Sequence, residues 1–131
     1  MALIQLSRLV QAAFARVADR HELPPMRARL LCVLAVSSRG MAELAREFGV
    51  EKAALTGLVD RAERQGLVER RAVPGDRRAV SVTLTPAGLQ TASRFHADVT
   101  AELGQLTASL TVAERASFRT ALAKITEAAE P

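Results

Sequence analysis

The sequence predicts a mainly α-helical protein with a small β-hairpin, an α+β fold of the winged helix-turn-helix type with additional helices at both ends. Three observations lead to this prediction. Two short amphipathic segments are joined by a glycine, an arrangement that is typical of a helix-turn-helix. Two short strand-like segments follow, separated by a turn rich in arginine. Both ends of the chain are amphipathic at helical spacing. We expect one domain over 1–131, with the winged unit in 24–85 and helices that pair two copies in 1–20 and 86–131.

Composition limits the class of protein. The chain has 131 residues, 49% of them hydrophobic and 24% charged, as in an ordinary globular domain. No apolar run approaches the length of about 20 residues that spans a bilayer, and the N-terminus lacks the uninterrupted apolar stretch of a signal peptide. The single cysteine, Cys32, excludes an internal disulfide and fits a reducing cytoplasm. A net charge of +4 permits an anionic partner.

The N-terminal part predicts two helices. Residues 3–19 carry apolar side chains at steps of three and four, so they form a helix that needs a partner surface. This stripe consists of Leu3, Leu6, Val10, Ala13, Phe14 and Val17. Pro24 and Pro25 interrupt it, and Pro25 suits the first turn of a second helix over 25–37, which is apolar enough to be a buried scaffold. Residues 37–40 end that helix.

The helix-turn-helix is predicted in 41–65. A short helix over 41–48 ends at Gly49, which supplies the positive φ of a tight turn. The second helix, 51–65, has a regular apolar stripe and ends before Gly66. The stripe consists of Leu55, Leu58, Val59 and Ala62. The opposite face is small or charged.

A β-hairpin follows. We expect a strand over 67–73, a turn at Pro74–Asp76 and a second strand over 79–84, whose apolar and polar residues alternate. Between Arg64 and Arg78 the chain has arginines at positions 64, 70, 71, 77 and 78 against Glu69 and Asp76, a local excess of +3. The hairpin tip is therefore suited to phosphate.

Two helices complete the chain. Thr85 and Pro86 suit the N-cap and first position of a helix over 86–105, with Phe95 or His96 on its apolar face. Thr111 and Glu114 form a capping box for a helix over 112–129. These helices have more apolar surface than one winged helix needs, and we expect the surplus to form a dimer interface.

Three motifs within 40–88 resemble the multiple-antibiotic-resistance regulator (MarR) family of bacterial transcription factors. They are ELA at 43–45, LVDRAERQGLVER at 58–70, and GDRRAVSVTLTPAG at 75–88. The last contains the Asp-x-Arg of the family's wing at Asp76 and Arg78, and its Leu-Thr-x-x-Gly at Leu84–Gly88. The resemblance implies a homodimeric, sequence-specific regulator, typically a repressor, that binds a pseudo-palindromic double-stranded DNA operator. Many members release DNA when a small phenolic or anionic effector binds between the dimerisation and DNA-binding regions.

The resemblance and the charges together select candidate DNA-binding residues. Arg78 is the first, because an arginine at a hairpin tip can enter a narrow minor groove, with Asp76 expected to orient its guanidinium. Arg70, Arg71 and Arg77 are expected to contact phosphates. The exposed face of the recognition helix is expected to enter the major groove. Its candidates are Lys52, Ala53, Thr56, Gly57 and Arg61. For Arg61, an ion pair with Asp60 or Glu63 is an equal alternative.

The sequence contains no enzymatic constellation, and we expect no enzyme activity, no cofactor and no metal site. His21 and His96 have no ligand-like spacing, although His21 with Glu22 could join a site across a dimer. Two alternative functions stay open. A winged helix can bind protein instead of DNA, which would give a weak salt dependence. Cys32 could sense oxidants, although its apolar neighbours favour a buried thiol.

Overall fold

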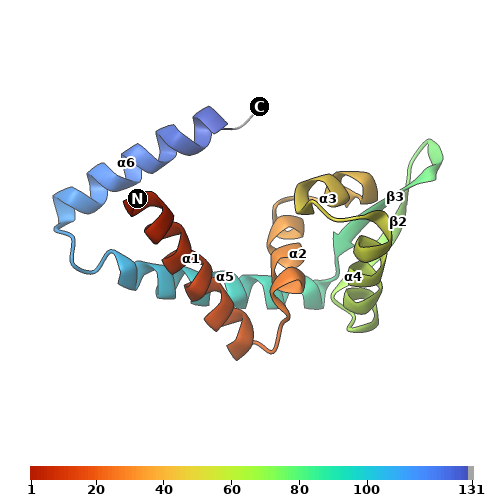
Figure 1. Ribbon diagram of the computed structural model, residues 1–131. Helices are drawn as coiled ribbons and strands as arrows, with labels where there is room; N and C mark the ends of the chain where they lie inside the picture. Colours follow the sequence, from red (N-terminus) through yellow and green to blue (C-terminus); the bar gives the residue numbers. More distant parts are fainter. Residues whose placement is uncertain (130–131) are drawn as a thin grey trace.

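The computed structural model describes residues 1–129, which form six helices and three short strands (Figure 1). The last two residues of the predicted 86–131 region lie outside this range. The elements, in chain order, are α1 (Ala2–Arg20), α2 (Pro25–Val36), β1 (Arg39–Gly40), α3 (Met41–Phe48), α4 (Lys52–Arg64), β2 (Val68–Val73), β3 (Asp76–Leu84), α5 (Pro86–Leu106) and α6 (Val112–Ala129). The predicted fold class, mainly helical with a small β-hairpin, is confirmed.

Helix α5 connects two separate parts of the molecule. Figure 1 shows α2, α3, α4 and the hairpin as a compact unit over one end of α5, while α1 crosses its middle and α6 turns back above the far end. The hydrophobic core fills the compact unit and extends to α1 and α5. Its largest fully buried side chains are Val17, Leu30, Leu31, Leu44, Leu55, Val59, Val68, Val82 and Phe95. Phe95, and not His96, thus lies on the buried face of α5.

Three residues of the helix-turn-helix fix its geometry. Gly49 has φ +62°, the left-handed conformation that was expected between the two helices. Leu44 and Leu55, one from each helix, are fully buried and join α3 to α4 through the common core. The recognition helix α4 is therefore held rigidly against α2 and α3.

The sheet has three strands in the order β1-β3-β2, all antiparallel. The sequence did not predict β1, whose Arg39 and Gly40 pair with Val82 and Ser81. Two residues are too few to show an alternating pattern, and only the arriving β3 makes them a strand. The second hairpin strand also begins at Asp76 and not at 79, so Arg77 and Arg78 lie in the strand itself.

The junction between the hairpin and α5 is closely packed. Thr85 caps α5, since its Oγ1 accepts a hydrogen bond of 3.0 Å from the Gly88 N–H, and it also donates one of 2.6 Å to the Gly66 carbonyl. A Cβ atom at Gly88 would lie 1.8 Å from the carbonyl oxygen of Leu67. Position 88 therefore admits only glycine, and the predicted Thr85 cap is confirmed.

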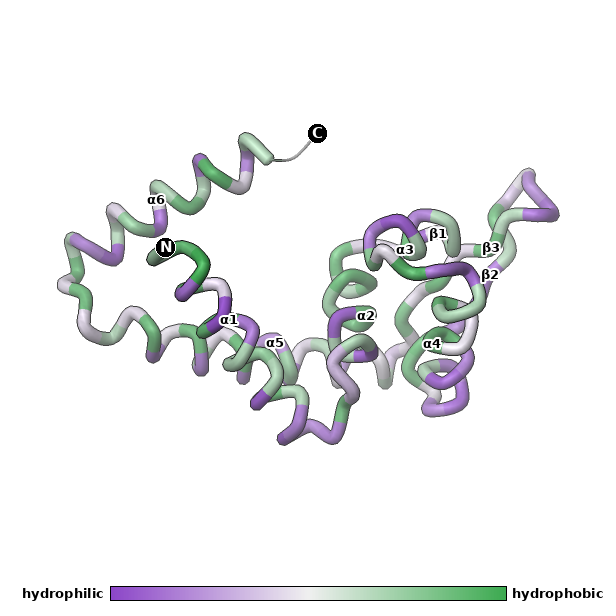
Figure 2. The backbone as a smooth tube through the Cα atoms, in the orientation of Figure 1, coloured by the Kyte–Doolittle hydropathy of each residue, from purple (hydrophilic) through white to green (hydrophobic). Residues whose placement is uncertain are grey.

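The ends of the chain are less buried. Of the α1 stripe only Ala13 and Val17 are buried, and Phe14 packs edge-on against Phe95 with ring centroids 5.0 Å apart. Helix α6 has no buried residue along its 18 residues, although its capping box forms as predicted between Thr111 and Glu114. Figure 2 shows apolar segments in both α6 and the start of α1. Among the described helices none has an apolar stretch long enough to traverse a bilayer.

Candidate nucleic-acid interface

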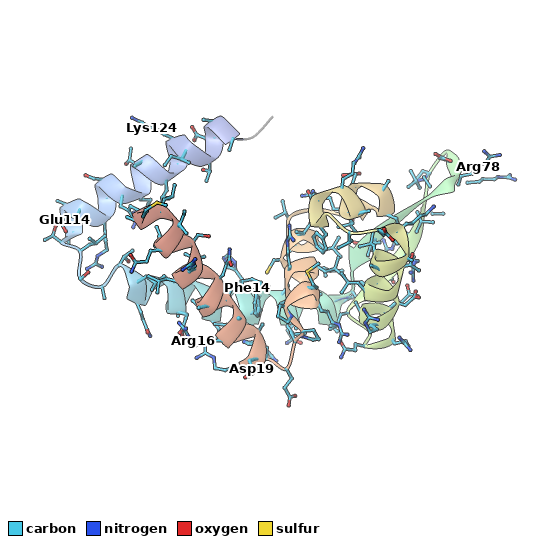
Figure 3. The ribbon with its side chains drawn as sticks, in the orientation of Figure 1. Phe14, Arg16, Asp19, Arg78, Glu114 and Lys124 are labelled. Atoms are coloured by element: carbon cyan, nitrogen blue, oxygen red, sulfur yellow. The ribbon has the colours of Figure 1, made fainter. Side chains whose placement is uncertain are left out.

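The wing, defined here as β2, β3 and their turn, projects from the body and ends in arginines. Its strands pair from Val68–Leu84 to Ala72–Val80, and a bulge follows before the turn. Arg77 and Arg78 are exposed at this end. Figure 3 shows the Arg78 side chain reaching beyond the end of the hairpin, away from every helix. Neither residue lies within ion-pair distance of a carboxylate in residues 1–129, so both charges are free to meet an anion.

Asp76 acts on the backbone of the wing. The prediction that it orients the Arg78 guanidinium is wrong for this structure: Asp76 Oδ1 accepts a hydrogen bond of 3.0 Å from the backbone N–H of Arg78. A carboxylate near the start of a turn commonly bonds an amide two residues on. Asp76 therefore shapes the wing tip, and the guanidinium two residues later is left unpaired.

The outer face of α4 carries the other predicted residues. Lys52, Ala53 and Thr56 are exposed on its first turns, and Thr56 Oγ1 donates to the Lys52 carbonyl at 2.9 Å. The methyl group of Thr56 is then available for contact with a base edge. The Arg61 guanidinium folds back over Gly57, with Nη1 3.4 Å from where a Cβ at Gly57 would stand. These five residues form one small, cationic surface.

Arg70 is not a free phosphate contact. It lies in β2 but its guanidinium turns onto α4, where it contacts Asp60 at 2.6 Å and Glu63 at 3.1 Å. Desolvation lowers the pKa of Arg70, but hydrogen bonds and charge attraction to Asp60 and Glu63 outweigh it and leave the pKa above its ordinary value. Arg70 thus connects the recognition helix to the wing. Because Asp60 and Glu63 pair with Arg70, neither forms the ion pair with Arg61 that was the alternative for that residue.

The Arg70→Met variant is expected to lower the free energy of unfolding by about 1 kcal/mol, since both carboxylate partners are partly solvated. The salt dependence of DNA binding should stay unchanged, because the Arg70 charge is already neutralised within the protein. Urea denaturation and DNA titration at several salt concentrations measure the two effects. A salt slope that falls by about one unit would instead place Arg70 on a phosphate. Arg71→Met, in the same strand, is the comparison: its exposed charge is a candidate phosphate contact, so its salt slope should fall by about one unit while its stability stays unchanged.

Arg71 has a weaker local partner. Its Nε lies 2.7 Å from Glu69 Oε1 on the same strand, and its side chain is 68% exposed. Such an exposed ion pair contributes little to stability, and Arg71 can readily exchange Glu69 for another anion. Arg71 therefore stays a candidate for phosphate contact, as does Arg77.

A hollow of about 600 Å³ lies between the first half of β3, α3 and the start of α4. Arg46 and Lys52 supply its charged lining, while Arg78 borders it on β3 with its guanidinium directed outward (Figure 3). Its apolar lining includes Met41, Ala42, Ala45, Ala79 and Val80. The sequence interpretation missed Arg46, although its position opposite Leu44 and Phe48 on α3 indicated an exposed side chain. The hollow lies within the cationic surface already described.

Cys32 is half-buried in α2, beside the core. Burial raises the pKa of the Cys32 thiol, so the thiol stays protonated at neutral pH. No second cysteine exists to form an internal disulfide. These facts disfavour, without testing directly, the thiol-sensing alternative.

DNA binding by the Cys32→Ser variant is expected to match that of the original chain, with and without hydrogen peroxide. Since the thiol pKa is raised, alkylation at neutral pH should be slower than for an unstructured cysteine peptide and should speed up as the pH approaches the thiol pKa. Iodoacetamide kinetics measured between pH 7 and 10 would check this. Peroxide-dependent release of DNA that the serine variant lacks would contradict it.

The histidines do not form a metal site in the described part of the chain. His21 Nε2 lies 2.7 Å from Asp98 Oδ2, and this pair fastens the end of α1 to α5. Within residues 1–129 no group of three histidine, cysteine or acidic side chains is arranged to hold a metal ion.

Comparisons with known proteins agree with this geometry. The family model described as "MarR family" matches residues 21–79. The homoprotocatechuate degradative operon repressor of Escherichia coli is 30% identical over 112 residues, covering 85% of this chain and 76% of that protein. The crystal structure of wild-type MarR from E. coli superposes with a TM-score of 0.83 at 25% identity, over 95% of this chain and 93% of that one. A cysteine-to-serine mutant of E. coli MarR complexed with operator DNA gives a TM-score of 0.71 at 25% identity, over 95% and 90%.

Proposed function

Because the chain belongs to the MarR family, and is thus a DNA-binding transcription regulator, we propose that it is a homodimeric repressor that a small effector releases from a pseudo-palindromic operator. Residues 24–85 form the DNA-binding region, and 1–20 with 86–131 form the dimerisation region. A relative of similar fold has been crystallised with operator DNA, which supports DNA binding by this fold.

The observation that carries the proposal is the distribution of unpaired cations. Lys52, Arg61, Arg77 and Arg78 lie on the outer face of α4 and at the wing tip, and within residues 1–129 none has a carboxylate partner. Arg16, Arg20 and Arg39 are paired with acids, whereas Arg8, Arg94 and Arg119 of the terminal helices also form no ion pair within residues 1–129. What distinguishes the α4 and wing cations is that they are grouped on one projecting surface. A DNA backbone supplies regularly spaced phosphates that such a surface can neutralise.

The terminal helices supply the dimer surface. An 18-residue helix with no buried residue, such as α6, is not stable alone in water. A groove of about 530 Å³ between α1, α5 and α6 is lined mostly by apolar side chains, among them Leu6, Val10, Leu103, Phe118 and Leu122. Leu3 and Ile125, at the two chain ends, are more than half exposed. A second copy covers these surfaces and brings two wings to one duplex.

The hollow beside α3 is our candidate effector site. Arg46 and Lys52 provide charge for a carboxylate, and the apolar wall suits an aromatic ring. An acid bound there would occupy cations that DNA needs, so release follows from direct competition. The relative named for repression of a homoprotocatechuate degradative operon makes aromatic acids the compounds to test first. This position differs from the site between the two regions that the resemblance implied.

Selection of bound sites from random duplex DNA tests the proposal. We expect a pseudo-palindrome whose half-sites are about one helical turn apart. Affinity for it should fall steeply with salt, through release of counterions from several phosphates. No enriched sequence, together with a weak salt slope, would favour the alternative of a protein-binding winged helix.

The effector is tested on the selected operator. An aromatic carboxylate should release DNA, whereas the corresponding neutral amide should not, because only the acid pairs with the Arg46 and Lys52 charges. Arg46→Gln should raise the half-release concentration about tenfold, since one charge-assisted contact is lost. Arg94→Gln, an exposed arginine of α5, is the matched control. Equal release of operator DNA by the acid and by the amide would contradict this assignment of the effector site.

A further inference from the structure

Arg27 is a charged residue in the buried stripe of α2. It begins the buried stripe of α2, whose later members are Leu30, Leu31 and Leu34. Its side chain is only 8% exposed. Arginine is almost never buried to this extent unless it is paired. The guanidinium Nε of Arg27 is nevertheless buried without any hydrogen-bond partner in residues 1–129.

The surroundings of Arg27 make its charge more costly. It lies in the first turn of α2, where the helix dipole is positive and no acidic residue is present. Burial, and then repulsion from Arg61 and Arg64 of α4, lower the pKa of Arg27. Within residues 1–129 none of these three arginines forms an ion pair. Arg61 and Arg64 are thus near enough to repel the Arg27 charge, and no acidic side chain of residues 1–129 pairs with any of the three.

A purely structural role explains only part of this cluster. Arg61 and Arg64 lie in the last turn of α4, where cations are favoured by the helix dipole. The same helix dipole makes a positive charge unfavourable at Arg27, because Arg27 lies near the N-terminus of α2. Its stem could pack as an apolar residue, but methionine or leucine would do so without burying an unpaired donor. Only Nε of Arg27 is a buried atom without a partner; the two Nη groups are not buried, so they can meet a ligand with acceptor oxygens at the surface.

We propose that Arg27, Arg61 and Arg64 form a phosphate-binding site between the start of α2 and the end of α4. The site joins the predicted DNA surface, because Arg61 also covers Gly57 on the outer face of the recognition helix. We assign its phosphate to the backbone of bound DNA, an assignment that rests on the proposed function. The backbone N–H groups of Met26 and Arg27 add donors at the same end, since they lack a carbonyl one turn earlier, whereas Pro25 has no N–H and Ala28 donates to Pro24. Free inorganic phosphate has the same chemistry and is the other source.

The test compares Arg27→Met with Arg94→Met, which removes an exposed arginine of α5 outside the cluster. Without phosphate or DNA, the melting temperature of Arg27→Met should rise, because a buried donor without a partner and the repulsion from Arg61 and Arg64 are both removed. Its affinity for the selected operator should fall about tenfold, and its salt slope by about one phosphate contact. The control should change neither quantity. Gain of stability with loss of affinity is what a binding role predicts and a structural role does not.

The melting temperature is also followed with increasing inorganic phosphate, at ionic strength held constant with chloride. A phosphate-dependent rise that Arg27→Met abolishes, with operator affinity unchanged, assigns the site to free phosphate. This arm needs no DNA, so it tests the cluster even if the chain binds no operator. The proposal is overturned if Arg27→Met changes neither operator affinity nor the response to phosphate. It is equally overturned if the variant only loses stability.

Discussion

Replacing Arg78 by alanine is expected to lower operator affinity about 100-fold while the dimer and its melting temperature stay unchanged. The side chain reaches beyond the wing and has no partner within residues 1–129, so its removal costs the fold nothing. Each guanidinium inserted into a minor groove contributes about 1–2 kcal/mol, and a dimer presents two wings. The sum corresponds to about two orders of magnitude in Kd. Gel-shift titration, with analytical ultracentrifugation and a thermal melt, measures all three quantities.

Two further variants separate the side chain of Arg78 from the shape of the wing. Asp76→Asn keeps an acceptor oxygen for the Arg78 N–H, so it should retain most of the affinity. Arg94→Ala removes one positive charge from α5 and controls for net charge. Unchanged affinity in Arg78→Ala would remove the wing from the proposed interface. A similar loss in Arg94→Ala would mean that only total charge matters.

Replacing Gly88 by alanine is expected to destabilise the protein by about 3 kcal/mol or more, enough to unfold a marginal domain. The added methyl carbon would stand 1.8 Å from the Leu67 carbonyl oxygen. The Leu67 carbonyl belongs to the backbone, so it cannot move aside as a flexible side chain would. It is also held in place by the Thr85 N–H, which donates to the same oxygen at 3.0 Å. Relief of the clash requires separation of α5 from the end of α4. Thermal denaturation followed by circular dichroism measures the loss.

Ala87→Ser is the control for this prediction, because it adds an atom to the neighbouring, exposed position of the same turn. Its melting temperature should lie close to that of the original chain. A Gly88→Ala variant that melts like the control would show that the junction can open without cost. The glycine of the Leu-Thr-x-x-Gly motif would then need another explanation.

The candidate site could be predicted only in part. Exposure of Lys52, Thr56 and Arg61 followed from helical periodicity, because the buried stripe of α4 defines the opposite face. The roles of Asp76 and Arg70 could not be predicted in the same way, since the sequence pattern shows that a side chain is charged but not which way it points. Arg70 was assigned to phosphate from its place in an arginine-rich hairpin. In the structure it turns onto α4, ten residues earlier in the chain.

The sequence by itself determined the helices, their caps, the glycine turn at Gly49 and the existence of the wing. These features depend on residues that are close together in the chain. The helices follow from apolar residues three and four positions apart, the caps from a threonine oxygen that accepts from a nearby amide, and the turn from a glycine with positive φ. Only the tertiary structure decided the rest. The strand at Arg39 exists because β3 pairs with it, Gly88 is required because Leu67 approaches it, and Arg27 is buried because α2 packs against α4. Each of these depends on a partner distant along the chain, whose position is set by packing of the whole core.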